Sequence, residues 1–284
     1  MKNIEELLGL LHLEAIEENI FCGQSRSVGS QRVFGGQVLA QALQAAIHTV
    51  PEGRLVHSLH AYFILPGDIE LPIVFEVDRI RDGGSFTTRR VKAIQKGQAI
   101  FNMSASFQKK QDGFDHQISM PNVTPPDGLM SWDQLVEELG SKLPENIRRF
   151  LEIVHPIEVR PVERIHPMLA GKRQPHRHVW MRSKGAMPDD ITAHQAVLAY
   201  ASDYNLLTTA LLPHGDQVAG ANIQLASLDH GMWFHRDFRM DDWLLYAIDS
   251  PSASGARGFT RGSVFDQEGR LVASAVQEGL MRPV

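Results

Sequence analysis

Three polar residues in the second half of the chain interrupt stretches that are otherwise apolar. Asp203 lies within a predicted helix, Ser227 shares one face of a predicted strand with Ile223 and Leu225, and Gln277 ends another strand. Burying an aspartate is costly unless it has polar partners. A single buried polar residue usually belongs to a network that only stabilises the core. Three of them, on elements that can line one groove, favour a functional site over a network that is only structural.

Other sequence patterns give weaker evidence for a catalytic or metal site. The sequence contains no G-x-S-x-G motif, which argues against a serine hydrolase of the α/β class. His176 and His178 would share one face of a strand, but no carboxylate follows at ligand spacing, and thirteen histidines make such a pair common by chance. Cys22 is the only cysteine, which excludes an internal disulfide and a cysteine-rich metal site. We therefore predict no metal site.

The composition is that of an ordinary globular protein, with 43% hydrophobic residues, 21% charged residues and a net charge of -5. This balance gives no general attraction to nucleic acid. Residues 1–21 predict an amphipathic helix, and its five glutamates do not fit a secretory signal. No segment is long enough to span a bilayer. We expect a cytoplasmic protein that does not insert into membranes and has no nucleic-acid partner.

The elements that must hold the three polar residues come in two similar sets. In the first set, Gly35 and Gly36 begin an apolar helix that ends before Pro51 and has too little polar surface to be exposed. Alternating segments separated by glycine turns then predict an antiparallel meander. Its strands are Leu55–Leu65, Pro72–Arg81, Ser85–Gln95 and Ala99–Gln108. A buried helix followed by such a sheet is an α+β pattern.

The second set repeats this order. Asp190 caps a predicted helix that runs from Ile191 to Leu212. Corresponding features, including His60 and His230, lie about 162 to 172 positions apart, which indicates an internal duplication. The predicted strands of this set are Ile157–Ile165, His178–Ser183, Gln224–Phe234, Trp243–Ser250, Arg257–Phe265 and Leu271–Glu278.

A polar segment rich in proline and glycine separates the two sets. We therefore predict an N-terminal half over residues 1–112, a linker over residues 113–155 and a C-terminal half over residues 156–284. The linker contains a predicted helix, Trp132–Leu143, and Pro144 can begin a second, short one. We expect the C-terminal half to carry the catalytic residues.

The three polar residues have no counterparts of the same type in the first half. The offsets between the two sets place Gln41, His57 and Ala105 at the corresponding positions. Because the helix of the first half contains no acid, we predict a single site per chain, with the first half supplying structure and part of the substrate wall.

Several segments also resemble one known family. They include RVFGGQVLAQAL at 32–43, RLVHSLHAYFILPGD at 54–68, YASDYNLL at 200–207, LDHGMWFHR at 228–236 and LVASAVQEG at 271–279. So many matching segments in this order are specific, and the chain is identified over nearly its whole length as a member of the acyl-CoA thioesterase II family. The resemblance implies a double hotdog fold, with two tandem units of one long helix wrapped by an antiparallel sheet. It also implies a homodimer or homotetramer.

The resemblance implies a reaction as well. Members hydrolyse medium- and long-chain acyl-CoA to fatty acid and CoA without a metal or covalent cofactor, using a water molecule held at positions that here are Asp203, Ser227 and Gln277. Ser227 stands where many members have threonine, so the hydroxyl is kept and the methyl group that restricts its rotamer is lost. The leaving thiol has a pKa of about 8.5, like that of cysteine, and needs no strong acid to depart.

Four further residues are candidates for substrate binding. Backbone N–H groups at a helix N-terminus can stabilise an oxyanion, and Gly36 and Gly231 are candidates, with a turn or packing glycine as the common alternative. Arg257 can meet the phosphates of CoA, or lie on a solvated strand face. His57 can act as a general base, although a strand histidine without a nearby carboxylate is more often structural.

Two other functions fit part of the pattern. A non-catalytic acyl-CoA binding protein would use the three polar residues only to line its pocket. A hotdog-fold hydratase or dehydratase acting on acyl-CoA would need an acid or histidine for proton transfer at the acyl chain. The combination of Asp203, Ser227 and Gln277 does not supply that group.

Overall fold

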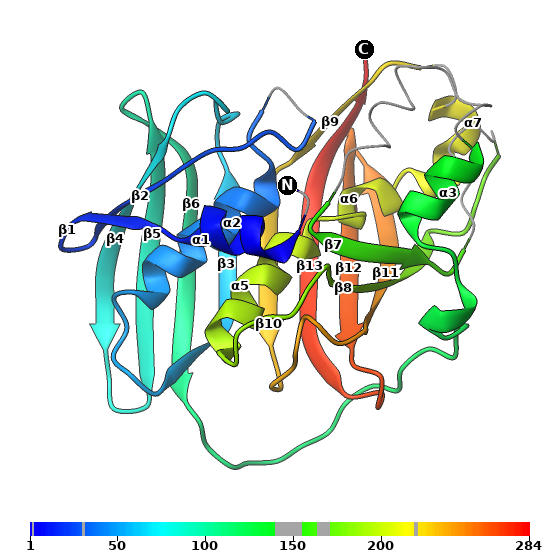
Figure 1. Cartoon of the computed structure of the whole chain (residues 1–284). Helices are drawn as coiled ribbons and strands as arrows, with labels where there is room; N and C mark the ends of the chain where they lie inside the picture. Colours follow the sequence, from blue (N-terminus) through cyan, green and yellow to red (C-terminus); the bar gives the residue numbers. More distant parts are fainter. Residues whose placement is uncertain (2, 30–31, 140–154, 164–170, 219–220) are drawn as a thin grey trace.

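The computed structural model describes residues 1–284 except residues 2, 30–31, 140–154, 164–170 and 219–220. In the described residues, 13 strands form one antiparallel sheet that curves around a central pair of helices (Figure 1). The two central strands are β3 (Arg54–Phe63) and β10 (Asp229–Phe234), which pair with each other through Asp229 to Trp233. The sheet therefore continues from the first half of the chain into the second.

The strand order is the same on both sides of this central pair. From β3 outward the sheet continues through β6 (Gln98–Lys109), β5 (Phe86–Gln95), β4 (Ile73–Asp82), β2 (Ile20–Gly23) and β1 (Glu14–Glu17). From β10 outward it continues through β13 (Leu271–Pro283), β12 (Arg257–Phe265), β11 (Leu244–Ser254), β8 (His176–Ser183) and β7 (Ile157–Pro161). Each half thus wraps its own helix, and the predicted α+β double hotdog fold is confirmed.

Local sequence explains where the strands turn. Between β5 and β6, Lys96 and Gly97 both have positive φ angles, of 51° and 72°. Two successive residues of positive φ form the tight turn whose twist matches that of paired strands, and glycine adopts this conformation without strain. The predicted turn is confirmed, and the ends of the meander strands agree with the prediction to within a few residues.

The helices at the centre are α2 (Gly35–Ile47) and α5 (Ile191–Ser202), and they pack against each other. Both are rich in alanine and almost entirely buried, as predicted for α2. Their closest approach lies at Gly36, where a Cβ atom would be 2.3 Å from the carbonyl oxygen of Tyr200. Only glycine fits at that position, so the N-terminus of α2 abuts the C-terminal turn of α5.

The N-terminal helix is shorter than predicted. Helix α1 (Ile4–Leu11) is capped by Asn3, whose side chain accepts a hydrogen bond from the backbone of Glu6, and its apolar face is buried. The predicted helix over residues 1–21 is wrong beyond Leu11, because the chain there forms the β1–β2 hairpin, with Asn19 at a φ of 64° in its turn. None of the helices in the described ranges is long and apolar enough to cross a bilayer.

The helix predicted from Ile191 to Leu212 is interrupted. Asp190 caps its start as predicted, but α5 ends at Ser202, and Asp203 is its C-cap. Asn205 then adopts a left-handed conformation with a φ of 64° before the short helix α6 (Leu206–Thr209). Asparagine is one of the few residues that tolerates this conformation. A 3-10 turn (Leu212–His214) and α7 (Gly215–Val218) follow.

The strand predicted from Gln224 to Phe234 is two strands. Strand β9 (Ile223–Ser227) pairs only with the C-terminal part of β13, whereas β10 lies between β13 and β3. His60 and His230, matched as corresponding positions in the sequence, lie on opposite faces of the sheet. His60 pairs with Gly231 and is exposed, whereas His230 is buried on the opposite face of the sheet.

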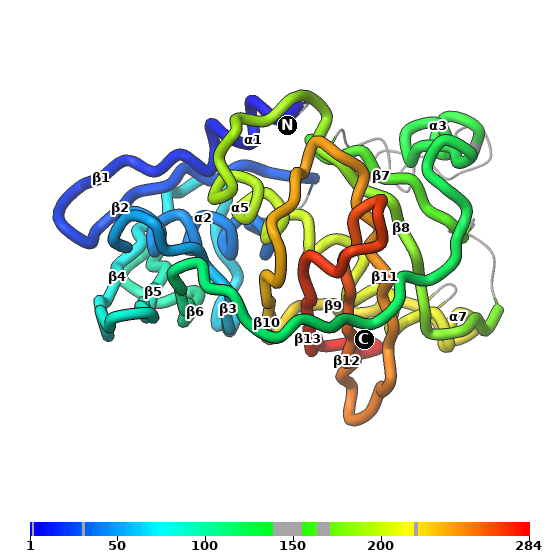
Figure 2. The backbone as a smooth tube through the Cα atoms, turned by 90° about the horizontal axis from the view of Figure 1, so that it is seen from below, coloured from blue at the N-terminus to red at the C-terminus, as the bar shows by residue number. Residues whose placement is uncertain are grey.

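The first part of the segment between the halves, which follows β6, runs along the outside of the sheet (Figure 2). The segment contains a 3-10 turn (Pro126–Gly128) and α3 (Trp132–Leu139), and the rest of the helix predicted to Leu143 and the short helix predicted at Pro144 lie outside the described residues. Its contacts are with the second half: Gln117 donates to the carbonyl oxygen of Gly269 and accepts from the backbone of Leu271. The predicted limits of the linker stay a prediction.

Candidate active site

The carboxylate of Asp203 joins the two halves. Its Oδ2 atom accepts a hydrogen bond of 3.0 Å from the backbone N–H of Gly36, and its Oδ1 atom accepts one of 2.7 Å from Nε2 of Gln277. The residue that precedes α2, Phe34, offers no capping hydrogen bond from its side chain. Asp203 therefore places a negative charge at the N-terminus of a helix from the other half, where the helix dipole stabilises it.

The side chain of Gln277 is fully buried on β13. Its Nε2 atom lies 2.7 Å from Asp203 Oδ1 and 3.3 Å from His230 Nδ1. A carboxylate only accepts hydrogen bonds, so the amide must turn its NH₂ group toward Asp203. The Oε1 atom of Gln277 has no hydrogen-bond donor in the described part of the chain. This atom is buried, so it does not offer an acceptor to the cleft, and a buried acceptor without a donor costs about 1 to 3 kcal/mol.

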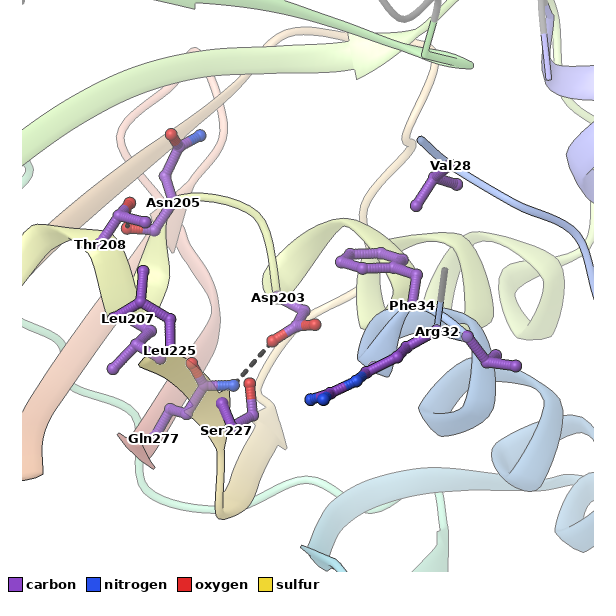
Figure 3. Close-up of a pocket in the computed structure, with 13 residues that line it drawn as sticks. Val28, Arg32, Phe34, Asp203, Asn205, Leu207, Thr208, Leu225, Ser227 and Gln277 are labelled. Atoms are coloured by element: carbon purple, nitrogen blue, oxygen red, sulfur yellow. Dashed lines mark hydrogen bonds between the residues drawn. The ribbon is translucent and has the colours of Figure 1, made fainter. Parts of the chain in front are cut away.

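Ser227 ends β9, opposite Gly279 of β13. Figure 3 shows its hydroxyl group pointing toward the hydrogen bond between Gln277 and Asp203. Among the described residues this hydroxyl makes no hydrogen bond, so it is available to a molecule in the cleft. Because the strand is interrupted between β9 and β10, Ser227 at the end of β9 lies in the site.

Asp203, Ser227 and Gln277 line one cleft of about 270 Å³, and the structure thus brings together the three residues that the sequence singled out. Its walls come from both halves (Figure 3). The remaining lining residues are Val28, Arg32, Val33, Phe34, Gly35, Asn205, Leu207, Thr208, Leu225 and Ala226. Most of them are apolar, and Arg32 extends its guanidinium group toward Ser227.

An aromatic cluster supports one wall of the cleft. The ring of Phe34 stacks on Tyr204 at 5.0 Å and meets Tyr200 edge-on at 5.1 Å. The hydroxyl of Tyr204 donates to that of Tyr200 over 3.1 Å. Burial raises the pKa of Tyr200 to about 12, so this hydroxyl is neutral at physiological pH. The cluster holds Phe34 and the start of α2 in place beside Asp203.

The four candidates for substrate binding lie outside this lining. The N–H of Gly36 is donated to Asp203, and Gly231 lies in the β10–β13 pairing, where a Cβ atom would be 3.0 Å from Val276. The imidazole of His57 is hydrogen-bonded through Nε2 to Ser106 Oγ, and burial lowers its pKa.

Arg257 is exposed and forms an ion pair of 2.9 Å with Glu278. A role in substrate binding for these four residues stays a prediction.

Two polar residues behind the cleft were not assigned to the site from the sequence. His230 and Ser202 are buried, and His230 Nε2 lies 3.0 Å from Ser202 Oγ. A signal was present, because His230 alternates with Met232 and Phe234 along β10 and so interrupts an apolar face, as the other three residues do. Burial lowers the pKa of His230 although Asp203 and Asp229 oppose this shift, so the imidazole is neutral.

The histidine pair His176 and His178 lies beside a carboxylate that precedes it in the sequence. His178 Nδ1 lies 2.6 Å from Glu163 Oε1, and the rings of His176 and His178 are 5.8 Å apart. In the part of the chain that the structure describes, no group of three histidine, cysteine or acidic side chains is arranged to hold a metal ion.

Comparisons with known proteins identify the family to which the chain belongs. Residues 24–108 match the family model for the acyl-CoA thioesterase N-terminal domain, and residues 148–280 match that for acyl-CoA thioesterase. The chain is 40% identical over 279 residues to acyl-CoA thioesterase 2 of Haemophilus influenzae, with 98% of each protein covered. It is 41% identical over 281 residues to human acyl-coenzyme A thioesterase 8, covering 96% of this chain and 88% of the relative.

A solved structure supports the same assignment. The acyl-CoA thioesterase II TesB2 of Mycobacterium marinum superposes with a TM-score of 0.80 at 44% identity, and 97% of each chain is covered. The chain therefore belongs to the acyl-CoA thioesterase II family, as its sequence segments predicted, and its enzyme class is that of the thioester hydrolases.

Proposed function

We propose that this thioesterase hydrolyses medium- and long-chain fatty acyl-CoA to a free fatty acid and CoA, by direct attack of a water molecule that Asp203, Ser227 and Gln277 hold. One observation carries the proposal. The Asp203 carboxylate is fixed from two sides, by the Gly36 N–H and by Gln277 Nε2, in a cleft that also contains the Ser227 hydroxyl. Each carboxylate oxygen keeps a lone pair that can accept a proton from water.

The proposed reaction has two steps. The water oxygen forms a bond to the thioester carbonyl carbon while its proton passes to Asp203, and general-base help of this kind contributes about 10²- to 10⁴-fold in rate. The tetrahedral intermediate then collapses, the carbon–sulfur bond breaks, and the proton leaves Asp203 for the departing thiolate or for solvent. Ser227 orients the water, because its hydroxyl can accept or donate a hydrogen bond, and Gln277 orients the Asp203 carboxylate by donating to Oδ1.

We assign stabilisation of the oxyanion to the N-terminus of α2. Gly35 is the first residue of this helix and lines the cleft, so the positive end of the helix dipole faces the reacting carbonyl. The N–H of Gly36 is already donated to Asp203, which makes it a positioning group in this proposal.

Apolar side chains support the preference for longer acyl chains. Val28, Phe34, Leu207 and Leu225 line the cleft beside the polar residues. Each buried methylene group contributes about 0.8 kcal/mol to binding. We therefore expect KM to fall as the acyl chain lengthens from acetyl to lauroyl. A homodimer or homotetramer in the cytoplasm is part of the same proposal.

The test measures CoA release, by free-thiol detection, from a short-, a medium- and a long-chain acyl-CoA. Wild type and Asp203→Asn are compared with and without a metal chelator. We expect release from the longer substrates that is insensitive to chelator and about 10²- to 10⁴-fold slower in Asp203→Asn at equal folded fraction. Release at the wild-type rate by the variant would contradict the assigned role of Asp203. Binding of acyl-CoA without release by wild type would instead favour a binding protein.

A further inference from the structure

The buried side of the proposed active site contains a chain of hydrogen bonds that the reaction itself does not use. His230, on β10, is only 1% exposed. Its Nδ1 atom lies 3.3 Å from Gln277 Nε2, and its Nε2 atom lies 3.0 Å from Ser202 Oγ. Ser202 in turn donates from Oγ to the carbonyl oxygen of Ala199 over 2.9 Å. The chain thus runs from the end of α5, through β10, to the amide of Gln277.

The direction of each hydrogen bond in this chain follows from the groups at its two ends, the carbonyl of Ala199 and the amide of Gln277. The carbonyl oxygen of Ala199 only accepts, so the Ser202 proton points toward it and Ser202 Oγ must accept from His230. His230 therefore carries its proton on Nε2, and its Nδ1 atom is an acceptor. The only group that Nδ1 faces within hydrogen-bond distance in the described residues is the NH₂ of Gln277, which is a donor.

Gln277 is consequently fixed by two acceptors. One N–H of its amide is donated to Asp203 Oδ1 and the other to His230 Nδ1. Turning the amide by 180° would set its oxygen against the Asp203 carboxylate and against the lone pair of Nδ1. This double constraint fixes the orientation of the amide, and with it the hydrogen bond that holds Asp203 Oδ1.

We infer that His230, supported by Ser202, is a positioning residue of this thioesterase, which locks the amide of Gln277 so that its NH₂ group stays hydrogen-bonded to Asp203 Oδ1 and fixes the carboxylate that activates the water. The inference rests on the proposed role of Gln277. It adds a neutral imidazole that never touches substrate. A misplacement of about 1 Å in such a group can lower a rate about a hundredfold, which is why a lock behind Gln277 matters.

The test is a double-mutant cycle of His230→Phe with Gln277→Ala, measured as kcat and KM for a long-chain acyl-CoA. Phenylalanine keeps the ring and removes both nitrogens. We expect His230→Phe to lower kcat about tenfold or more and to change KM less than about threefold. In the Gln277→Ala background the same substitution should change kcat less than about twofold, because coupled residues are not additive.

Two further variants separate positioning from packing. His230→Asn keeps an acceptor near the position of Nδ1 and should recover kcat to within about fivefold of wild type. His194→Phe is the matched control, because His194 is equally buried and both of its nitrogens are hydrogen-bonded, to Met240 and Pro188, outside the cleft. It should lower stability and leave kcat unchanged.

A wild-type kcat in His230→Phe, or an equal loss in the presence and absence of Gln277, would overturn the inference. If His230→Phe does not fold, Ser202→Ala takes its place in the cycle, and the same criteria apply with a smaller expected loss of about threefold. If Gln277→Ala alone leaves kcat unchanged, the assigned role of Gln277 fails, and this inference fails with it. Asp203→Asn still reports separately on water activation in that case.

Discussion

Gln41 in the first half and Asp203 in the second belong to corresponding helices at the centre of the molecule, and their surroundings differ. Gln41 is fully buried, and its Nε2 atom donates to the carbonyl oxygens of Leu10 and Gln24 at 2.9 Å each. Asp203 accepts two hydrogen bonds and still borders a cleft. The amide of Gln41 donates its hydrogen bonds to the N-terminal segment that covers α2, whereas the carboxylate of Asp203 stays open to a ligand.

The difference does not make the cleft a property of the second half alone. Asp203 is held by the backbone of Gly36, and Phe34 and Gly35 form part of the wall. One continuous sheet joins the halves through β3 and β10. The first half has therefore kept the architecture of a hotdog unit and supplies the helix end that fixes the acid, while the second half supplies the reactive side chains.

The contact between the halves at Gly36 should be very sensitive to substitution. In Gly36→Ala the new Cβ atom would lie 2.3 Å from the Tyr200 carbonyl oxygen, which is backbone and cannot move aside. We expect the free energy of unfolding to fall by about 1 to 3 kcal/mol or more, and kcat to fall about a hundredfold because Asp203 is displaced. Chemical denaturation and steady-state kinetics measure the two effects.

Gly9→Ala is the control for that substitution. Gly9 lies exposed in α1, and a Cβ atom there would have no neighbour within 4 Å. Alanine in a helix interior is more stable than glycine by roughly 0.5 to 1 kcal/mol. A variant Gly36→Ala with unchanged rate and stability would show that the helix contact does not position the acid.

A substitution in the first half that lies away from the cleft should change stability only. Arg89 is fully buried and donates to both Thr49 Oγ1 and the Thr49 carbonyl oxygen, beyond the end of α2, and to Asp82. In Arg89→Met these acceptors lose their donor, and we expect a loss of about 2 to 4 kcal/mol in the free energy of unfolding. The kcat of the remaining folded protein should equal that of wild type, and a tenfold lower value would refute the division of roles.

Substitutions at Ser227 should have a smaller effect on the rate. Ser227→Ala removes the hydroxyl that faces the cleft, and we expect kcat to fall about tenfold, in the range of one lost hydrogen bond. Ser227→Thr keeps the hydroxyl and restricts its rotamer, so its kcat should stay within about twofold of wild type. Equal rates for the two variants would remove Ser227 from the water-binding group.

The two halves should also differ slightly in the pH dependence of stability. Burial lowers the pKa of His230 and of His57, so at pH values just below about 6.5 the unfolded chain binds protons that the folded chain does not. The free energy of unfolding therefore falls as the pH falls through this range. Because His230 is fully buried and His57 is half-buried, His230→Asn should flatten this dependence more than His57→Asn. Urea denaturation at pH 7.5 and 5.5 gives the comparison, and the reverse order would contradict it.

Much of the fold could be predicted because its signals are local. The alternation of the strands, the turn at Lys96-Gly97 and the apolar composition of α2 depend on residues close together in the sequence. Asp203, Ser227 and Gln277 could be found for the same reason, since each interrupts an apolar face.

The parts that could not be predicted depend on distant contacts. Gly36 and Asp203 are 167 positions apart, so neither residue indicates the hydrogen bond between them. The helix ends at Ser202 because Asn205 adopts a positive φ, which helix propensity alone does not reveal. His60 and His230 were matched as corresponding positions although they lie on opposite faces, because a shift of one position in a strand reverses every side chain.

The most direct test of the account compares Asp203→Asn with Gln41→Leu. Each removes one central polar function from its own half, and kcat for a long-chain acyl-CoA and the free energy of unfolding are measured for both. We expect Asp203→Asn to lose about 10²- to 10⁴-fold in kcat with a small change in stability. Gln41→Leu should keep its kcat and lose about 1 to 3 kcal/mol of stability, because buried carbonyl groups lose their donor. An equal loss of kcat in the two variants, or none in Asp203→Asn, would contradict the claim that the second half alone activates the water.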